Sequence, residues 1–248
     1  MGTTRVVVLA LGLAIAGVAC GLLPQVYAQD LPGVKPVADE RSAGMPSPLT
    51  DSAVANARQA ASAALLRLGP SVSAVITDHH LGFTSLAELN RATAGSPIQI
   101  AFVRLDRLAA YANGQSPNSI IDSGGAVMVP VLVDGTARCA VMLKANGSVF
   151  TGAGLGQPNM TRLVTQSLEA TAKEHNTPSG ALVVLKVPAL FLTFIARSAE
   201  AAIWLTPVSD TPTFDLRAGQ ELSAEVVFAR LQPAAQNYHP STLSVHTR

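Results

Sequence analysis

The chain has 248 residues, of which 48% are hydrophobic and only 13% are charged, and its formal net charge is +1. This composition excludes a chain that is kept disordered by its own charge. Because the sequence has no block of basic residues, neither nucleic acid nor an anionic membrane surface is expected as a partner. The length suffices for one large domain or two small ones with a buried core.

Residues 1–28 have the three parts of a secretory signal peptide. The start carries one positive side chain, Arg5, and an apolar run follows over Val6–Leu23. Val26 and Ala28 then occupy the two positions that a signal peptidase recognises. We therefore expect cleavage after Ala28, in a bacterial host, and a mature protein that is periplasmic or secreted.

The same residues allow two alternatives. Val6–Leu23 is just long enough to be an uncleaved membrane anchor. Cys20 could instead be a lipid-attachment site, although Gly17 stands where such a site usually has a large aliphatic residue. After cleavage no membrane span is expected, because the most apolar later segment, Leu182–Leu205, is interrupted by charged or cyclic residues: Lys186, Pro188, Arg197 and Glu200.

Beyond the signal peptide, the sequence predicts a leader, a folded domain and a tail. Residues 29–50 are rich in proline and glycine and indicate a flexible leader. Residues 51–238 form the domain, and residues 239–248 are a polar tail. If Cys20 is removed with the signal peptide, Cys139 is the remaining cysteine, so no internal disulfide is expected.

The first part of the domain is predicted to contain helices and short strands. The first helix begins with a cap at Asp51 or Ser52 and is stopped by Gly69-Pro70. Ser85 with Glu88 makes a capping box for a second, short helix. The segments expected after the first helix are a weak strand, this short helix, a strand, a helical turn and a loop: Ser71–Thr77, Ser85–Ala92, Ile98–Val103, Leu105–Ala112 and Gly114–Gly125.

The middle of the domain predicts an antiparallel meander. Val127–Val133 and Thr136–Lys144 are strands joined by Asp134-Gly135, the dipeptide of a tight two-residue turn. Asn146-Gly147 is the second turn, and Ser148–Thr151 begins a third strand. Because proline cannot donate to a ladder, Pro130 is expected to place the first strand at an edge or in a bulge.

The rest of the domain repeats this order of elements. Asn159 is predicted to cap a helix that ends near Asn176 and Pro178, and Ser223 caps a last helix through Leu231 that continues towards Asn237. Three strands lie between them: Leu182–Lys186, Ala189–Arg197 and Ala201–Val208.

Three strands and a helix thus occur twice, over 125–177 and 180–238, which leaves an internal duplication open. The predicted fold class is α+β, with an antiparallel sheet built from hairpins and meanders and amphipathic helices packed against it.

Two local motifs are candidates for ligand binding. Gly152–Gly156 lies between a strand and a helix, where a glycine-rich turn can hold phosphate. Gln157, however, stands where the dinucleotide fingerprint has glycine, so we expect a plain turn and no cofactor. Asp78-His79-His80 is a local cluster of metal-type ligands, but the remaining histidines are isolated and expected to be exposed: His175, His239 and His246. We therefore expect no metal.

Catalytic groups are not identified by any motif. Cys139 lies in the middle of a strand, as a small buried hydrophobe usually does. Carboxylates could pair in space, although their spacing does not indicate it: Asp106, Asp122, Asp210, Asp215 and Glu221. The long polar loop Thr206–Gly219, with Trp204 and Phe214 near it, is the best candidate for a recognition surface.

The sequence thus favours an exported, non-enzymatic domain that binds a protein, a peptide or a component of the cell envelope. The alternative is an exported hydrolase whose active site is assembled from distant positions and carries no motif. A structure in which polar groups converge in a cleft would distinguish the two.

Overall fold

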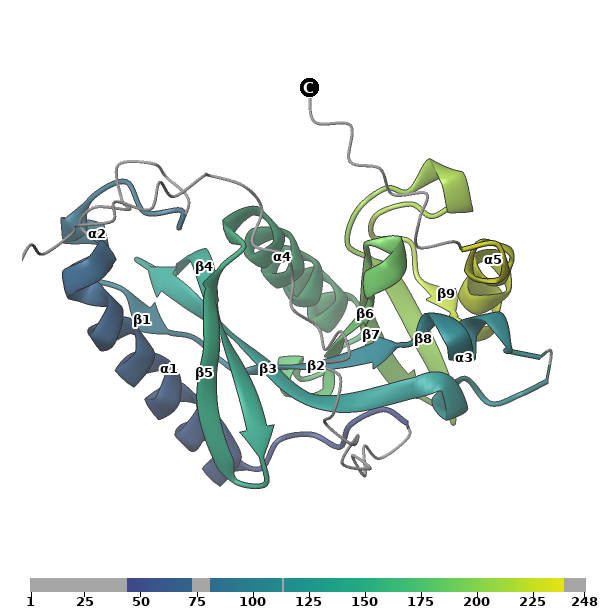
Figure 1. Ribbon diagram of the computed structural model, residues 1–248, viewed down its shortest axis with the longest axis horizontal. Coiled ribbons are helices and arrows are strands. Elements are labelled where there is room, and N and C mark those ends of the chain that lie inside the picture. Colours follow the sequence, from purple (N-terminus) through teal and green to yellow (C-terminus); the bar gives the residue numbers. More distant parts are fainter. Residues whose placement is uncertain (1–43, 73–80, 113, 239–248) are drawn as a thin grey trace, which may run out of the picture. The chain divides into compact units, whose positions relative to one another are not determined.

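The computed structural model describes residues 44–72, 81–112 and 114–238. In this part of the chain nine strands form one sheet, and five α-helices pack against it, so the predicted α+β class is confirmed (Figure 1). Eight strands form a continuous path across the sheet: β5 (Val149–Gly156), β4 (Thr136–Asn146), β3 (Ile121–Val133), β2 (Ile98–Val103), β6 (Val183–Val187), β7 (Leu192–Ala199), β8 (Ala202–Pro207) and β9 (Leu222–Ser223). The ninth, β1 (Thr93–Ala94), pairs with β3. The helices are α1 (Asp51–Val72), α2 (Leu86–Asn90), α3 (Leu105–Ala109), α4 (Pro158–Glu174) and α5 (Ala224–Gln236).

Two antiparallel meanders flank β2 in the centre of the sheet. The predicted meander is β3–β4–β5, and β6–β7–β8 is a second one. β2 is antiparallel to β3 but parallel to β6, with Gln99 opposite Val183 and Phe102 opposite Lys186. This one parallel pair needs a long crossover, which the chain makes through the first meander and α4.

Helix α4 covers one face of the sheet centre. Its buried Val164 and Leu168 pack against side chains of β2, β6 and β7, among them Ile100, Val184 and Ile195. Its buried side chains recur at helical spacing, which is what places one stripe of the helix on the sheet. None of the helices in the described ranges is both long and apolar enough to cross a membrane.

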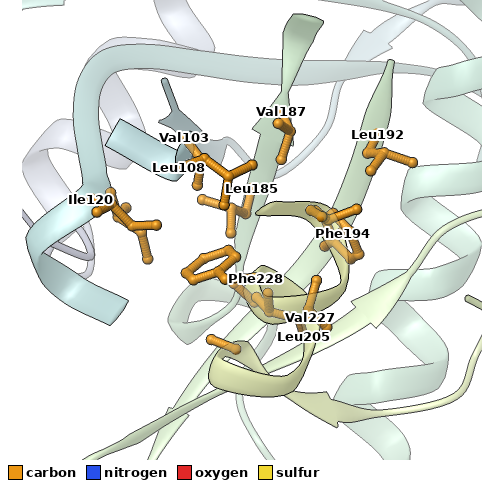
Figure 2. Close-up of a cluster of buried hydrophobic side chains, with 14 of the residues drawn as sticks. Val103, Leu108, Ile120, Leu185, Val187, Leu192, Phe194, Leu205, Val227 and Phe228 are labelled. Atoms are coloured by element: carbon orange, nitrogen blue, oxygen red, sulfur yellow. The ribbon is translucent and has the colours of Figure 1, made fainter. Parts of the chain in front are cut away.

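The opposite face is covered by α1 on one half and by α3 and α5 on the other. Alternate residues of β3 and β4, such as Val129 and Val141, pack against Ala57 and Ala61 of α1. On the other half, Figure 2 shows Phe228 of α5 among buried side chains of the sheet and of α3: Leu185, Phe194, Leu205 and Leu108.

Both predicted tight turns of the first meander are present. Asp134 and Gly135 have φ of 52° and 79°, the pattern of a type I′ turn. In the second turn the two loop residues are Gly147 and Ser148, because Asn146 still pairs with Val149. Only Gly147, with φ of 60°, needs the left-handed region there. The turn is therefore one residue later than predicted.

Pro130 does not lie in an edge strand, because β3 has β4 on one side and β1 and β2 on the other. The predicted bulge is not at Pro130 either, because Pro130 pairs regularly with Ala140. The register does shift between Val131 and Leu132, but the extra residue there is Arg138 of β4. The carbonyl of Pro130 accepts the N–H of Gly95 at 2.8 Å in the gap between β1 and β2.

Helix α1 differs from its prediction at both ends. Its cap is Thr50, whose Oγ1 accepts the N–H of Ala53 at 3.3 Å, and not Asp51 or Ser52. It continues through Gly69-Pro70 to Val72, since a proline removes one N–H and stops the helix only shortly afterwards. The predicted strand Ser71–Thr77 is therefore wrong at its first two residues, and 73–77 lie outside the described residues.

Two further boundaries are corrected. Helix α4 is not capped by Asn159: Pro158 occupies its first turn, as prolines often do, and the preceding Gln157 has φ of 58° and no capping side chain. The predicted loop Gly114–Gly125 ends earlier, because residues from Ile121 onward pair with β2 as the start of β3.

Candidate functional site

The glycine-rich segment Gly152–Gly156 is the second half of strand β5 and not the turn that the sequence predicted. Gly152 pairs with Leu143, and Gly156 pairs with Ala140. A bulge between these pairs absorbs one residue, so pairing continues to the end of the segment. The chain turns towards α4 only at Gln157.

Strand β5 is the outermost strand on its side of the sheet. The tight turn closes on the pair Asn146 and Val149, and in an antiparallel ladder hydrogen-bonded and non-hydrogen-bonded pairs then alternate. This alternation directs the N–H and C=O groups of Phe150 and Gly152 away from β4. Within the described ranges no strand pairs with these groups.

This edge lacks most of the features that protect sheet edges from further pairing. Its eight residues include no charged side chain and no proline, and its one protective feature is the bulge. By contrast, the strand at the other end of the path, β9, is only two residues long. A long, uncharged edge is a template for an additional strand.

The glycines leave the main chain of β5 bare. No atom lies within 4 Å of the place where a Cβ would stand on Gly154 or Gly156, and a Cβ on Gly152 would lie 3.7 Å from that of Ala64. Two large apolar side chains nearby in the fold are exposed, Val149 in β5 (61%) and Leu66 in α1 (80%). The edge therefore offers main-chain hydrogen bonds and apolar surface.

Helix α1 holds β5 in place. It packs against β5 and β4 and runs alongside β5 in Figure 1. Near its start, Asn56 donates from Nδ2 to the carbonyl of Ser148 in the β4–β5 turn at 3.4 Å. Phe150 and Leu155 of β5 pack partly buried against the same cluster as α1. The helix thus supports one face of the strand.

Cys139 is fully buried under α1. Burial raises the pKa of its thiol to about 12, so the thiolate that a nucleophile requires is strongly disfavoured. The sequence-based interpretation of Cys139 as a small buried hydrophobe agrees with this position.

The five candidate carboxylates each contact a cation or a backbone N–H. The partners are Arg104 for Asp106 (2.8 Å), Arg107 for Asp122 (2.8 Å), the Ala218 N–H for Asp210 (2.8 Å), Arg230 for Asp215 (3.2 Å) and Arg197 for Glu221 (2.9 Å).

A polar cluster that the sequence did not indicate lies around Glu221. Arg197 of β7 donates two hydrogen bonds to its carboxylate, and Nε2 of His175, at the end of α4, lies 3.3 Å from Oε1 without the alignment of a hydrogen bond. The His175 side chain is 22% exposed, so the expectation of an isolated, exposed histidine is wrong. The cluster ties α4 to the β7–β9 end of the sheet.

The loop Thr206–Gly219 is largely engaged with the protein itself. Phe214 packs against the α5 side of the core. Thr211 and Leu216 form a small bridge, and the N–H of Gly219 donates to the carbonyl of Pro207 at 3.0 Å. Trp204 lies in β8 opposite Arg197 and is partly buried. Of the two aromatic side chains expected at this surface, Phe214 thus contributes to packing.

Asp78-His79-His80 lies outside the described residues. Among the residues that are described, no group of three histidine, cysteine, aspartate or glutamate side chains could hold a metal ion.

No family model, curated protein or solved structure matches this chain. The functional argument therefore depends on the geometry of the chain itself. The edge position of β5 could not be found from the sequence, because strand order depends on distant pairings. One signal was available: the absence of charge over eight consecutive strand residues.

Proposed function

We propose that the protein is an exported, non-enzymatic binding domain that takes an extended segment of a partner protein or peptide onto the outer edge of β5. The observation that carries this proposal is the row of outward N–H and C=O groups on an uncharged, proline-free edge strand. The export step depends on residues 1–28, which lie outside the described residues.

Binding of this kind adds one strand to the sheet. Main-chain hydrogen bonds provide affinity, and alternate side chains of the added strand provide specificity. The open space beside Gly154 and Gly156 accommodates large side chains of the ligand, and the exposed Val149 adds apolar contact area. The supporting packing of α1 keeps the strand extended before the ligand arrives, which lowers the entropy cost of binding.

The alternative function, hydrolysis at a dispersed site, has less support. The five candidate carboxylates contact cations or N–H groups, and the one described cysteine is buried with a raised pKa. A binding role is consistent with all of these observations.

The experiment uses one position with a matched control. Gly152→Pro removes an outward N–H, whereas Gly152→Ala keeps it and adds a Cβ at an ordinary contact distance of 3.7 Å. A displayed library of random eight-residue peptides is selected on the wild-type protein. We expect the selected peptides to lose at least tenfold in affinity for Gly152→Pro and to bind Gly152→Ala within about twofold.

Hydrogen exchange locates the bound peptide. A bound strand should slow exchange of the Phe150 and Gly152 amides in the wild-type protein. Circular dichroism of both variants checks that they fold alike. If the peptides bind Gly152→Pro as well as the wild type, or protect a different element, β5 is not the binding site.

A further inference from the structure

The C-terminal segment Ser241–Thr247 has the sequence of a strand. Its two apolar residues, Leu243 and Val245, alternate with the polar Thr242, Ser244 and His246. It contains β-branched residues and has no glycine, proline, aspartate, glutamate, lysine or arginine. The segment belongs to the part that composition alone classifies as a polar tail, and it lies outside the described residues.

The start of this segment is fixed by the end of α5. Gln236 donates from Nε2 to the carbonyl of Ala109 in α3 at 3.1 Å, and α3 directly follows the end of β2. The tail therefore leaves the fold beyond the end of β2 at Val103, which is opposite Ile121.

From this point β5 of the same chain is out of reach. Across the strands, β5 lies three strand spacings from β2, which is about 14 Å. Along the strands, Val149, the residue of β5 nearest to Val103, lies about 10 Å from the level of Val103. The three residues 238–240 that precede the strand-like segment extend over about 11 Å at most. A second copy has no such restriction.

We propose that Ser241–Thr247 of one copy adds to the free edge of β5 in a second copy, so that the protein assembles through its own C-terminal segment. This inference rests on the proposed function and names its partner. The segment brings no acidic side chain and no lysine or arginine, and β5 has no charge to oppose. Its apolar side chains, Leu243 and Val245, add apolar contact in the open space beside the glycines of β5.

The test measures the molar mass of the exported protein by light scattering, at micromolar concentration. Val245→Pro breaks the donor strand, and Val245→Thr is its control because threonine keeps the N–H and the strand propensity. Wild type and Val245→Thr should be dimers or larger. Val245→Pro and Gly152→Pro should be monomers, while Gly152→Ala should assemble like the wild type.

A labelled synthetic peptide with the sequence of residues 240–248 is then titrated into the Val245→Pro protein, whose β5 edge is free. It should bind at least tenfold more tightly than a scrambled peptide. A monomeric wild type overturns the inference. This holds even if the tail of the same chain slows hydrogen exchange of the Gly152 amide. If library peptides bind at β5 but the tail peptide does not, the inference fails while the proposed function stands. If no peptide depends on Gly152, both fail.

Discussion

The Arg197 guanidinium and the Glu221 carboxylate face each other with two hydrogen bonds, Nε to Oε1 at 3.1 Å and Nη2 to Oε2 at 2.9 Å. Their side chains are only 15% and 18% exposed. This pair joins β7 to the residue before β9 and therefore holds the last strand on the sheet. Bidentate geometry is the strongest arrangement available to an arginine and a carboxylate.

The first prediction follows from this pair. Arg197→Met leaves a largely buried carboxylate without its cation, so we expect a loss of about 2–4 kcal/mol in the free energy of unfolding. The double variant Arg197→Met with Glu221→Leu should lose clearly less. Urea unfolding of both single variants and the double variant measures the coupling. If the loss in the double variant equals the sum of the losses in the two single variants, the interaction between Arg197 and Glu221 contributes nothing to the free energy of unfolding.

The second prediction concerns the first tight turn. Gly135 has φ of 79° and no atom within 4 Å of a Cβ position, so a side chain there meets backbone strain but no steric clash. Gly135→Val should therefore cost about 1–3 kcal/mol. Gly180→Val is the control, since Gly180 has equal space without a positive φ, and it should stay within about 0.5 kcal/mol of wild type. Equal losses in urea melts would contradict the strain argument.

The third prediction concerns the buried thiol. Cys139→Ser places a hydroxyl among apolar side chains and should cost about 1–3 kcal/mol at neutral pH. Burial raises the pKa of the Cys139 thiol in the folded protein from 9.0 to about 12. The contribution of the protonated thiol to the free energy of unfolding is therefore fully present below pH 9 and is lost as the pH rises through 12. The serine hydroxyl does not ionise in this range, so the difference between the two proteins should shrink from pH 9 upward.

Urea melts at several alkaline pH values measure this difference, and a thiol reagent provides a second readout. Native Cys139 should react far more slowly than the unfolded protein. Rapid native labelling would mean that the strand register is wrong.

The fourth prediction concerns Lys186, which lies in β6 between Phe102 and Thr193. Burial lowers the pKa of its ammonium group, so the unfolded chain binds its proton more tightly and the charged form costs stability at neutral pH. Lys186→Met should raise the free energy of unfolding by about 0.5–2 kcal/mol. The gain should shrink as pH rises towards the usual lysine range.

Lys144→Met is the control for this substitution, because Lys144 in β4 is exposed. It should change stability by less than about 0.5 kcal/mol. A stabilisation of equal size in both variants would show that the burial of Lys186 is not its cause.

Local signals predicted the elements that depend on local chemistry. Ser85 caps α2, with its Oγ accepting the N–H of Glu88 at 3.2 Å, and Ser223 caps α5 by accepting the N–H of Val226 at 3.3 Å. The turn at Asp134-Gly135 formed where the dipeptide indicates it. In each case the determining residues lie within four positions of one another.

Apart from local boundary errors at the ends of α1, at the start of α4 and at the second turn, the errors concern relationships between distant residues. The parallel pairing of β2 with β6 joins Ile100 to Val184, and no local pattern indicates that contact. The same limit applies to the candidate site: glycine favours turns, so the sequence of Gly152–Gly156 predicts a turn, whereas pairing with β4 keeps the segment extended. His175 was expected to be exposed because its partner, Glu221, is far away in the sequence.

The parallel contact between β2 and β6 also determines the order in which the sheet can be completed. Before Ile100 can meet Val184, the chain must close a loop that contains the whole first meander and α4. Contacts of such sequence separation slow folding, since the entropy of loop closure is lost before any pairing is gained. The centre of the sheet therefore forms only after the second half of the chain has been made. The folding rate should therefore respond most to substitutions at the β2–β6 contact.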